Sequence, residues 1–235
     1  LDGMSSGKVR IGFAGPATVA GRVTGTVSVD QVSRGREGTG LADESRGSVT
    51  ISTVMNVYRP AAPVVGRPSV NLGSVREGTL FPVETISLTN AVPADGYSEG
   101  LNAVFGVKTG DAFTNGARVD RLVPGGVDAL SMQVGLGGVN VAGAKAGTVN
   151  LGFVSDGFGT SGLANLDLGV QQVQLSGTVY RLATGQAPEV VQLASVREGG
   201  SFTMTGLPIR NTAVSDGFSE KLNAAFGAIS GDVLT

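Results

Sequence analysis

Apolar and polar side chains alternate along most of this chain with a period of two residues. Clear examples are the segments 84–89, 131–136, 148–153 and 172–180. In each of them one side-chain face is apolar and the other polar, as in an antiparallel strand that is buried on one face only. Val, Ile and Thr are abundant and strong helix formers are sparse, which also favours strands. The pattern therefore predicts an all-β protein.

Short turn sequences separate these runs. They are Pro93-Ala94-Asp95-Gly96, Pro124-Gly125-Gly126 and Ser155-Asp156-Gly157, whose residue types favour tight turns. The spacing predicts about seven antiparallel strands in a unit of roughly 115–120 residues, which is typical of an immunoglobulin-like β-sandwich. A parallel β-helix is the main alternative for a Gly-rich repeat. Its rungs would recur every ~20–25 residues, and no such short period is visible.

The chain also repeats itself over a longer distance. Segment 74–78 (Ser-Val-Arg-Glu-Gly) returns at 195–199, and 95–99 (Asp-Gly-Tyr-Ser-Glu) returns at 216–220 as Asp-Gly-Phe-Ser-Glu. Between residues 74 and 106, 16 of 33 positions are identical to the positions 121 residues later. A fixed period of this length indicates tandem copies of one module. A residue present in every copy is better suited to building the module than to performing a single reaction.

Further matches predict where the modules begin and end. Segments 39–42 and 56–59 match positions 122 residues later, whereas 7–13 matches 147–153 at an offset of 140. The difference of 18 residues predicts an insertion at about 14–38. We therefore expect three tandem parts: the back half of a sandwich module with this insertion (1–60), a complete module (64–183), and the front half of a further module (187–235).

Half a module leaves apolar faces uncovered and strand edges unpaired. The chain has no initiator Met and no signal peptide, which predicts a piece of a longer precursor. The halves are then completed in one of two ways. In the simpler one, they continue into further residues of one polypeptide. In the other, the front half of one chain pairs with the back half of the next by strand complementation, which builds an open-ended filament.

Composition narrows the functional classes. The net charge of −2 excludes a broad basic surface for nucleic acid, and no apolar run approaches the ~18–20 residues of a membrane span. The chain contains no His and no Cys. It therefore has no disulfide framework, thiolate nucleophile, Ser-His-Asp triad or two-His metal site. We predict a protein that is not an enzyme and has no cofactor.

Four features together resemble a known family. They are a strand that ends in Asn90, the turn Pro124-Gly125-Gly126, the run Ala146-Gly147-Thr148-Val149, and the segment 173–183 that ends a module. They resemble the bacterial choice-of-anchor D repeat, a Hydin-like immunoglobulin-type β-sandwich of large exported proteins, and the resemblance covers essentially the whole chain. It implies an extracellular or cell-surface location and a non-enzymatic scaffold.

Charged residues near the module boundaries are candidates for contacts between modules. Arg76-Glu77 and Arg197-Glu198 follow the first strand of a module, and Arg59 and Arg181 end a last strand just before the linkers. We expect Arg–Glu contacts across the boundary, with Arg76-Glu77 and Arg197-Glu198 facing the preceding module. The alternative is a solvated turn with an ion pair worth about 0–1 kcal/mol.

Two further motifs have a functional and a structural interpretation. Asp95, Asp156 and Asp216 are weak calcium candidates, because calcium needs ~6–8 oxygens and the Asp95–Glu99 turn, like its copy, supplies only two carboxylates. Capping of backbone N–H groups by Asp in a turn is the alternative. Segment 157–162 fits Gly-x-Gly-x-x-Gly, but dinucleotide binding needs a following helix. We predict a Gly-rich loop between the last two strands.

These observations predict a non-catalytic structural repeat protein of a bacterial cell surface or extracellular matrix. It would form a stalk or filament, and its partners would be neighbouring modules or copies of itself. The alternative is an adhesin or carbohydrate-binding module that recognises a surface glycan or protein through the Gly-rich loops or the insertion. Sugar binding usually uses exposed aromatics, and because only 5% of residues are aromatic and Trp is absent, this alternative ranks second.

Overall fold

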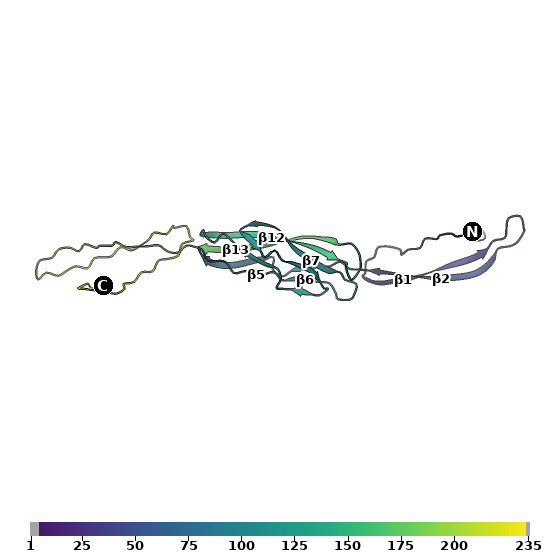
Figure 1. The fold of residues 1–235 in the computed structure, drawn as a ribbon, viewed down its shortest axis with the longest axis horizontal. Coiled ribbons are helices and arrows are strands. Elements are labelled where there is room, and N and C mark those ends of the chain that lie inside the picture. Colours follow the sequence, from purple (N-terminus) through teal and green to yellow (C-terminus); the bar gives the residue numbers. More distant parts are fainter. Residues whose placement is uncertain (1–4, 234–235) are drawn as a thin grey trace.

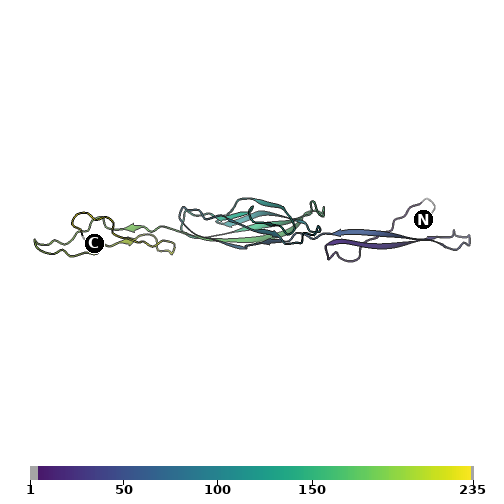
Figure 2. The ribbon, with the colours of Figure 1, turned by 90° about the horizontal axis from the view of Figure 1, so that it is seen from below.

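The computed structural model describes residues 5–233, and every regular element in this range is a strand. A central body (residues 61–180) lies between a thinner N-terminal arm (5–57) and a thinner C-terminal arm (185–233), so that the molecule is elongated (Figures 1 and 2). None of the described residues belongs to a helix that is long and apolar enough to cross a membrane. The predicted all-β fold is confirmed.

Two layers of strands form the central body. One is a five-stranded sheet in the order β4 (Ser69–Arg76), β13 (Leu166–Tyr180), β12 (Gly143–Asp156), β7 (Gly100–Gly110) and β9 (Arg118–Leu122). The other layer consists of two three-stranded sheets, in the orders β10 (Val127–Asp128), β6 (Leu88–Asn90), β3 (Pro63–Val65) and β5 (Glu84–Thr85), β11 (Gln133–Leu136), β8 (Ala112–Thr114).

The order of these strands defines the class of fold. Taking β5 with β6 and β10 with β11 as single interrupted strands, the second layer has the order A-B-E-D of an immunoglobulin-like sandwich, and β7, β12 and β13 provide its C, F and G strands. β4 lies parallel to β13, whereas all other pairings between described strands are antiparallel. The expected sandwich of about seven antiparallel strands is confirmed for the central body, with β4 and β9 at the edges of the C-F-G layer.

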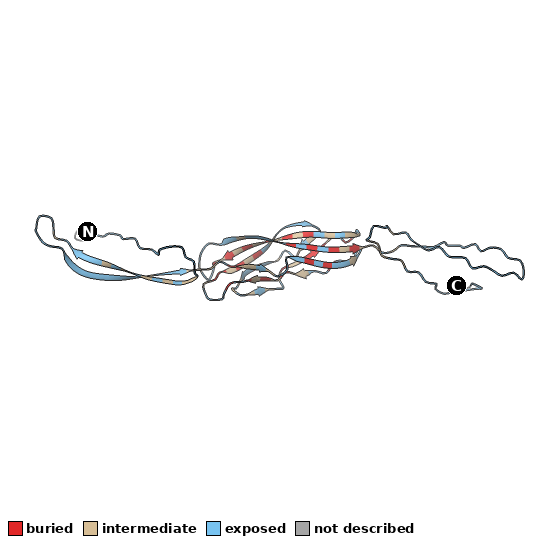
Figure 3. Cartoon of the chain, turned by 180° about the vertical axis from the view of Figure 1, so that it is seen from behind, coloured by how far each residue is buried: buried red, intermediate tan, exposed pale blue. Residues whose placement is uncertain are grey.

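The core fills the space between the two layers. Ile86, Met132 and Val134 from one layer meet Leu151 and Phe153 from the other, and each of these side chains is 0–1% exposed. Burial alternates along β12 as the sequence pattern requires. All buried apolar residues of the described chain lie between Ala61 and Val179, and Figure 3 shows them confined to the central body while both arms are exposed.

The N-terminal arm is a long antiparallel hairpin of β1 (Gly21–Ser33) and β2 (Glu44–Val57). Its register repeats that of β12 and β13: Gly21 pairs with Val57 just as Gly143 pairs with Val179, 122 residues later. The register also shifts at matching places, after Gln31 in β1 and after Phe153 in β12. With this offset applied throughout, 16 of the 41 residues in 19–59 are identical to those in 141–181.

This register corrects the insertion that was predicted at 14–38. β1 occupies most of that range and is the counterpart of β12, so the offset of 122 holds without a gap. The match of 7–13 with 147–153 arose because strand sequences alternate between a few apolar residues and glycine. Short segments of this kind match one another in more than one register.

The C-terminal arm contains few regular strands. β14 (Gly185–Gln186) pairs antiparallel with β15 (Arg210–Asn211), and most of the other described residues of the arm are exposed and lack regular structure. Its apolar side chains are therefore without a covering layer in this chain (Figure 3).

Candidate junctions between modules

The N-terminal arm joins the central body through the end of β2 and the turn at 95–99. The backbone N–H of Arg59 donates to the Tyr97 carbonyl (2.7 Å), and the N–H of Glu99 donates to the Arg59 carbonyl (3.0 Å). The Arg59 guanidinium Nη1 donates to Asp95 Oδ2 (3.0 Å) and to Ser98 Oγ (2.6 Å). One arginine thus fastens the turn through both its backbone and its side chain.

The central body joins the C-terminal arm in the same way. The N–H of Arg181 donates to the Phe218 carbonyl (2.8 Å), and the N–H of Glu220 donates to the Arg181 carbonyl (2.9 Å). Arg181 Nη1 donates to Asp216 Oδ2 (2.7 Å) and to Ser219 Oγ (3.1 Å). Each of the four hydrogen bonds described for Arg59 and Glu99 therefore has a counterpart at Arg181 and Glu220, so this part of the arrangement is a repeated feature of the chain.

Aromatic pairs and tight turns complete both junctions. The Tyr58 and Tyr97 ring centroids are 5.8 Å apart, and those of Tyr180 and Phe218 are 6.3 Å apart, both tilted, within the range of favourable aromatic contacts. The aspartate that begins each turn accepts the N–H two residues later at 2.9 Å. The glycine between them has a positive φ of 80° or 85°, a conformation that glycine adopts without a steric penalty.

The electrostatics of the two junction aspartates differ in their main cause. The Tyr97 N–H, followed by the Arg59 guanidinium, holds the pKa of Asp95 below its ordinary value of 3.8. For Asp216 the Arg181 guanidinium comes first and the Phe218 N–H second, again lowering the pKa below 3.8. Both carboxylates are partly exposed, with 38% and 35% of their side-chain surfaces accessible, so salt screens these pairs.

We predict that Arg181→Ala raises the pKa of Asp216 by more than Arg59→Ala raises that of Asp95. The first substitution removes the largest cause of the shift, whereas the second leaves the Tyr97 N–H in place. Because both pKa values are lowered by folding, the carboxylates stabilise the junctions above pH ~3.8, and this contribution is lost as the pH falls through the folded pKa. Carboxyl-carbon NMR titration measures both effects. Equal responses of the two aspartates would contradict this assignment of causes.

Asn90 ties the linker to the central body. Its side chain is fully buried: Oδ1 accepts the Ala62 N–H (3.1 Å), and Nδ2 donates to the carbonyls of Glu99 (3.0 Å) and Leu122 (3.1 Å). The sequence pattern identifies Asn90 only as the end of a strand and indicates no role for its side chain. The repeat does point to a structural role for this residue, because Asn90 recurs as Asn211 among the positions that are identical 121 residues later.

Asn211 makes two of the same three hydrogen bonds. Its Oδ1 accepts the Thr184 N–H (3.1 Å), and its Nδ2 donates to the Glu220 carbonyl (3.0 Å). Asn211 is exposed, unlike Asn90. The second junction therefore has similar local hydrogen bonds, but no second layer of strands buries Asn211 as one buries Asn90.

Glu99 is a buried carboxylate at the first junction, 5% exposed. Ser155 Oγ donates to its Oε2 (2.6 Å), and Ser161 Oγ donates to its Oε1. Ser155 Oγ also accepts the Ala61 N–H (2.8 Å). In the sequence Glu99 is only one of the two carboxylates of the 95–99 turn, and its role is not apparent because its two serine partners lie more than fifty residues away in the chain.

The predicted Arg–Glu contacts have varied outcomes. Arg76 Nε lies 2.8 Å from Glu220 Oε1, and Glu77 Oε1 lies 3.9 Å from Arg181 Nε while it accepts the Ala142 N–H (2.7 Å). Arg76 thus faces the following segment, not the preceding module as expected. The reason is that β4 runs parallel to β13, so both strands end at the second junction. Within residues 5–233, Arg197 and Glu198 form no ion pair.

The three aspartates that were considered as calcium ligands accept hydrogen bonds from groups of the protein itself. Asp95 and Asp216 contact arginines as described, and Asp156 accepts hydrogen bonds from the Phe158 N–H (2.9 Å) and from Asn102 Nδ2 (3.1 Å). No group of three or more acidic side chains in the described range is arranged to hold a metal ion. The Gly-rich segment 157–162 is a turn between β12 and β13, and a strand follows it, not the helix that dinucleotide binding needs.

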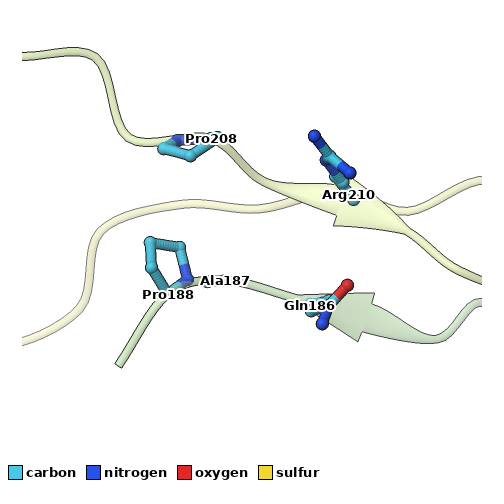
Figure 4. Close-up of a pocket in the computed structure, with 5 residues that line it drawn as sticks. All are labelled: Gln186, Ala187, Pro188, Pro208 and Arg210. Carbon is cyan, nitrogen blue, oxygen red and sulfur yellow. The ribbon is translucent and has the colours of Figure 1, made fainter. Parts of the chain in front are cut away.

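A hollow of about 250 Å³ lies beside the second junction and is lined by Gln186, Ala187, Pro188, Pro208 and Arg210 (Figure 4). In the central body the corresponding strands stay together one step further, where the Gly66 N–H donates to the Ser87 carbonyl (2.9 Å). By register, Pro188 replaces Gly66 and Pro208 replaces Ser87. Proline has no N–H to donate, so the ladder ends at Gln186 and the hollow opens beyond it.

Comparison with known proteins identifies no family for this chain. No family model matches the chain, and no curated protein matches it. Among solved structures the chain is similar to the ASH / PapD-like domain of human CEP192 (PapD-like domain 7), at 10% sequence identity and a TM-score of 0.36, over 52% of this chain and 87% of that one. The strand order described above, not this distant similarity, defines the central body as an immunoglobulin-like β-sandwich.

Proposed function

We propose that the protein is a non-catalytic structural repeat protein of a bacterial cell surface or extracellular matrix, in which tandem sandwiches build a stalk or filament. In this proposal the central body is one complete module, the two arms belong to neighbouring modules, and the working sites are the junctions. The choice-of-anchor D resemblance and the absence of His and Cys support an exported scaffold over an enzyme.

The observation that carries the proposal is the repetition of the junction. Arg59 and Arg181 make matching backbone and side-chain contacts to the turns that follow them. A chance contact between flexible segments would not recur with the same atoms 122 residues later. Because the two junctions share these arginine contacts, we expect successive modules to adopt a similar relative orientation, which would make an array of them extended.

Two measurements test the proposal. Antibodies against the central body are expected to label intact source cells or the material around them, and electron micrographs of that material are expected to show rods or fibres. Labelling only after lysis would overturn the surface location. Irregular globular particles would overturn the scaffold role.

Arg181→Ala is expected to make the molecule more flexible without unfolding the central body. The substitution removes the side-chain bonds to Asp216 and Ser219 but touches no core residue. Small-angle X-ray scattering should therefore show a shorter maximum dimension. The free energy of unfolding of the central body should stay within about 0.5 kcal/mol of the wild-type value. Arg118→Ala, which removes an exposed pair with Asp120, is the matched control and should change neither property.

One surface feature favours the second candidate, a carbohydrate-binding or adhesive module. An open hollow of about 490 Å³ is lined by polar side chains and one exposed aromatic: Asn102, Arg118, Asp120, Arg121, Asp156, Phe158 and Asn165. Phe158 is 72% exposed and carries the Arg121 guanidinium 4.7 Å above its ring. A glycan array tests this candidate, and binding that disappears in Phe158→Ala would support it. An array without hits would exclude this candidate and leave the structural scaffold as the remaining function.

A further inference from the structure

A β-bulge lies at one edge of the five-stranded sheet, where β7 pairs with β9. The register of the two strands shifts between Leu101 and Ala103. Asn102 of β7 therefore stands opposite two residues of β9, Asp120 and Arg121. Bulges of this kind re-aim side chains and are frequent next to functional sites. All three residues line the open hollow of about 490 Å³ described above, so the bulge forms one wall of that hollow.

Arg121 has a backbone conformation that is unusual for its residue type. Its φ is +50°, and among residues 5–233 it is the only residue other than glycine with a positive φ. Residues with a Cβ atom rarely adopt this left-handed region, because it carries a steric cost. The Arg121 N–H donates to Asn102 Oδ1 (2.6 Å), which holds the conformation in place. Backbone strain clusters at ligand-binding sites, so Arg121 is a candidate binding residue.

The Arg121 guanidinium is held by an aromatic ring. It lies 4.7 Å over the centroid of the Phe158 ring, and this cation–π contact keeps the charge in place. Within residues 5–233 the guanidinium donates no hydrogen bond and forms no ion pair. The neighbouring Arg118, by contrast, is paired with Asp120 at 2.9 Å. A guanidinium can bind a carboxylate through two parallel hydrogen bonds, so Arg121 offers the hollow one cation for an anionic group.

Carboxylate and amide groups line the rest of the hollow. Asp156 accepts one hydrogen bond at each oxygen, from the Phe158 N–H (2.9 Å) and from Asn102 Nδ2 (3.1 Å). These two donors, the Phe158 N–H first, lower the pKa of Asp156 below its ordinary value of 3.8, so the carboxylate is ionised at neutral pH. Each of its oxygens has room for a second hydrogen bond. The Asn165 side chain makes no hydrogen bond within the described residues. The hollow can therefore accept hydrogen bonds from the hydroxyl groups of a ligand.

The lining of the hollow differs between modules, although the turn that carries part of it has the same length. With the offset of 122, Asp156 and Asn165 correspond to Arg34 and Asp43 of the N-terminal arm. Arg34 Nε and Asp43 Oδ2 lie 3.7 Å apart, so these two side chains neutralise each other. In the central body the same two positions hold an aspartate and an amide with no hydrogen bond between them. A residue that changes from copy to copy is better suited to a specific contact than to building the module.

We propose that this hollow binds the uronic acid units of an acidic polysaccharide. The carboxylate of one sugar pairs with the Arg121 guanidinium, and its hydroxyl groups donate to Asp156 and Asn165. A volume of about 490 Å³ falls within the ~300–1,000 Å³ that is typical of ligand pockets. This inference rests on the second candidate function, a carbohydrate-binding module, and names its ligand.

The mixture of charges favours a sugar acid over an acidic peptide. An acidic peptide carries carboxylates on many successive residues, and Asp120 and Asp156 would repel those that do not meet Arg121. A uronic acid carries one carboxylate on a ring with several hydroxyl groups. This pattern matches a hollow with one unpaired cation among several hydrogen-bond acceptors.

Titration of the full chain with oligomers of galacturonate and of glucuronate tests the proposal. Proton–nitrogen correlation NMR is expected to show shifts at the backbone N–H groups of Arg121 and Phe158 and at the side-chain amide of Asn165. The methyl-esterified oligomers keep the ring and the hydroxyl groups but lack the charge, so they should bind about tenfold more weakly. Polyglutamate, which has the charge but no hydroxyl groups, should cause none of these shifts.

Arg121→Gly separates binding from folding. It removes the guanidinium, and glycine adopts a φ of +50° without strain, so binding should be lost while the denaturation midpoint stays the same or rises. Arg121→Lys keeps the charge but not the planar pair of donors, and it should weaken binding by about fivefold. Arg67→Ala is the matched control, because its ion pair with Glu84 lies outside the hollow, and it should bind like the wild type.

Each alternative result overturns a different part of the proposal. Equal binding of the acid and its methyl ester would overturn the uronic acid while leaving a neutral sugar as the ligand. Equal shifts with polyglutamate would identify an acidic peptide instead. No shift with either uronate, or unchanged binding by Arg121→Gly, would overturn the site itself. All of these results are distinct from failure of the scaffold function, which depends on surface labelling and on the shape of the native material.

Discussion

Phe81→Ala is expected to destabilise the central body by about 3–5 kcal/mol, the usual cost of removing a buried phenylalanine ring. The ring is 4% exposed and lies directly over Gly177, where a Cβ atom would approach its Cε1 to 2.6 Å. The surrounding strands belong to both layers, so they cannot collapse into the space that the ring leaves. Chemical denaturation at low protein concentration measures the loss.

Phe202→Ala is the matched control, since the same residue type stands 121 positions later at the same place in the repeat. Its ring is 72% exposed in the chain, and the expected change in the stability of the central body is within about 0.5 kcal/mol. An equal cost for both variants would mean that the C-terminal arm is packed in solution. The uncovered face described above would then be wrong.

Asn90→Ala is expected to cost roughly 2–4 kcal/mol, because it leaves the Ala62 N–H and the carbonyls of Glu99 and Leu122 without their side-chain partner. Buried groups that lose a hydrogen bond carry a desolvation penalty of about 1–3 kcal/mol each, part of which water entry relieves. Hydrogen exchange at the Ala62 N–H should accelerate by more than the change in global stability.

Asn211→Ala removes the equivalent contacts at an exposed site. Water replaces the lost partner there, so the expected effect is below about 1 kcal/mol. A larger effect at Asn211 than at Asn90 would contradict the argument from burial.

The sequence predicted the all-β sandwich because alternation specifies which face of each strand is buried, as along β12. It did not predict the register of the N-terminal arm. A seven-residue match between 7–13 and 147–153 outweighed the true offset, and only the pairing of Gly21 with Val57 resolves the choice. Alternating sequences specify a face well and a register poorly.

The junctions were predicted in part. Arg59 and Arg181 were singled out by their position before the linkers and were expected to contact glutamates, whereas their closest acidic partners are Asp95 and Asp216 of the turns that follow. The direction of Arg76 depends on the parallel pairing of β4 with β13, which local pattern does not encode. The partners of Asn90 and Glu99 are distant in the chain, so their roles become visible only in the fold.

The parallel pairing of β4 with β13 has a consequence under load. The chain enters the central body through the short strand β3, which pairs with β6, continues into β4 and leaves at the end of β13. Once β3 has detached from β6, a pull on the two junctions draws the parallel strands β4 and β13 past each other in opposite directions. The hydrogen bonds of the ladder then bear the force together, in shear, instead of breaking one after another. A fibre built from such units would hold under tension until the whole ladder yields at once.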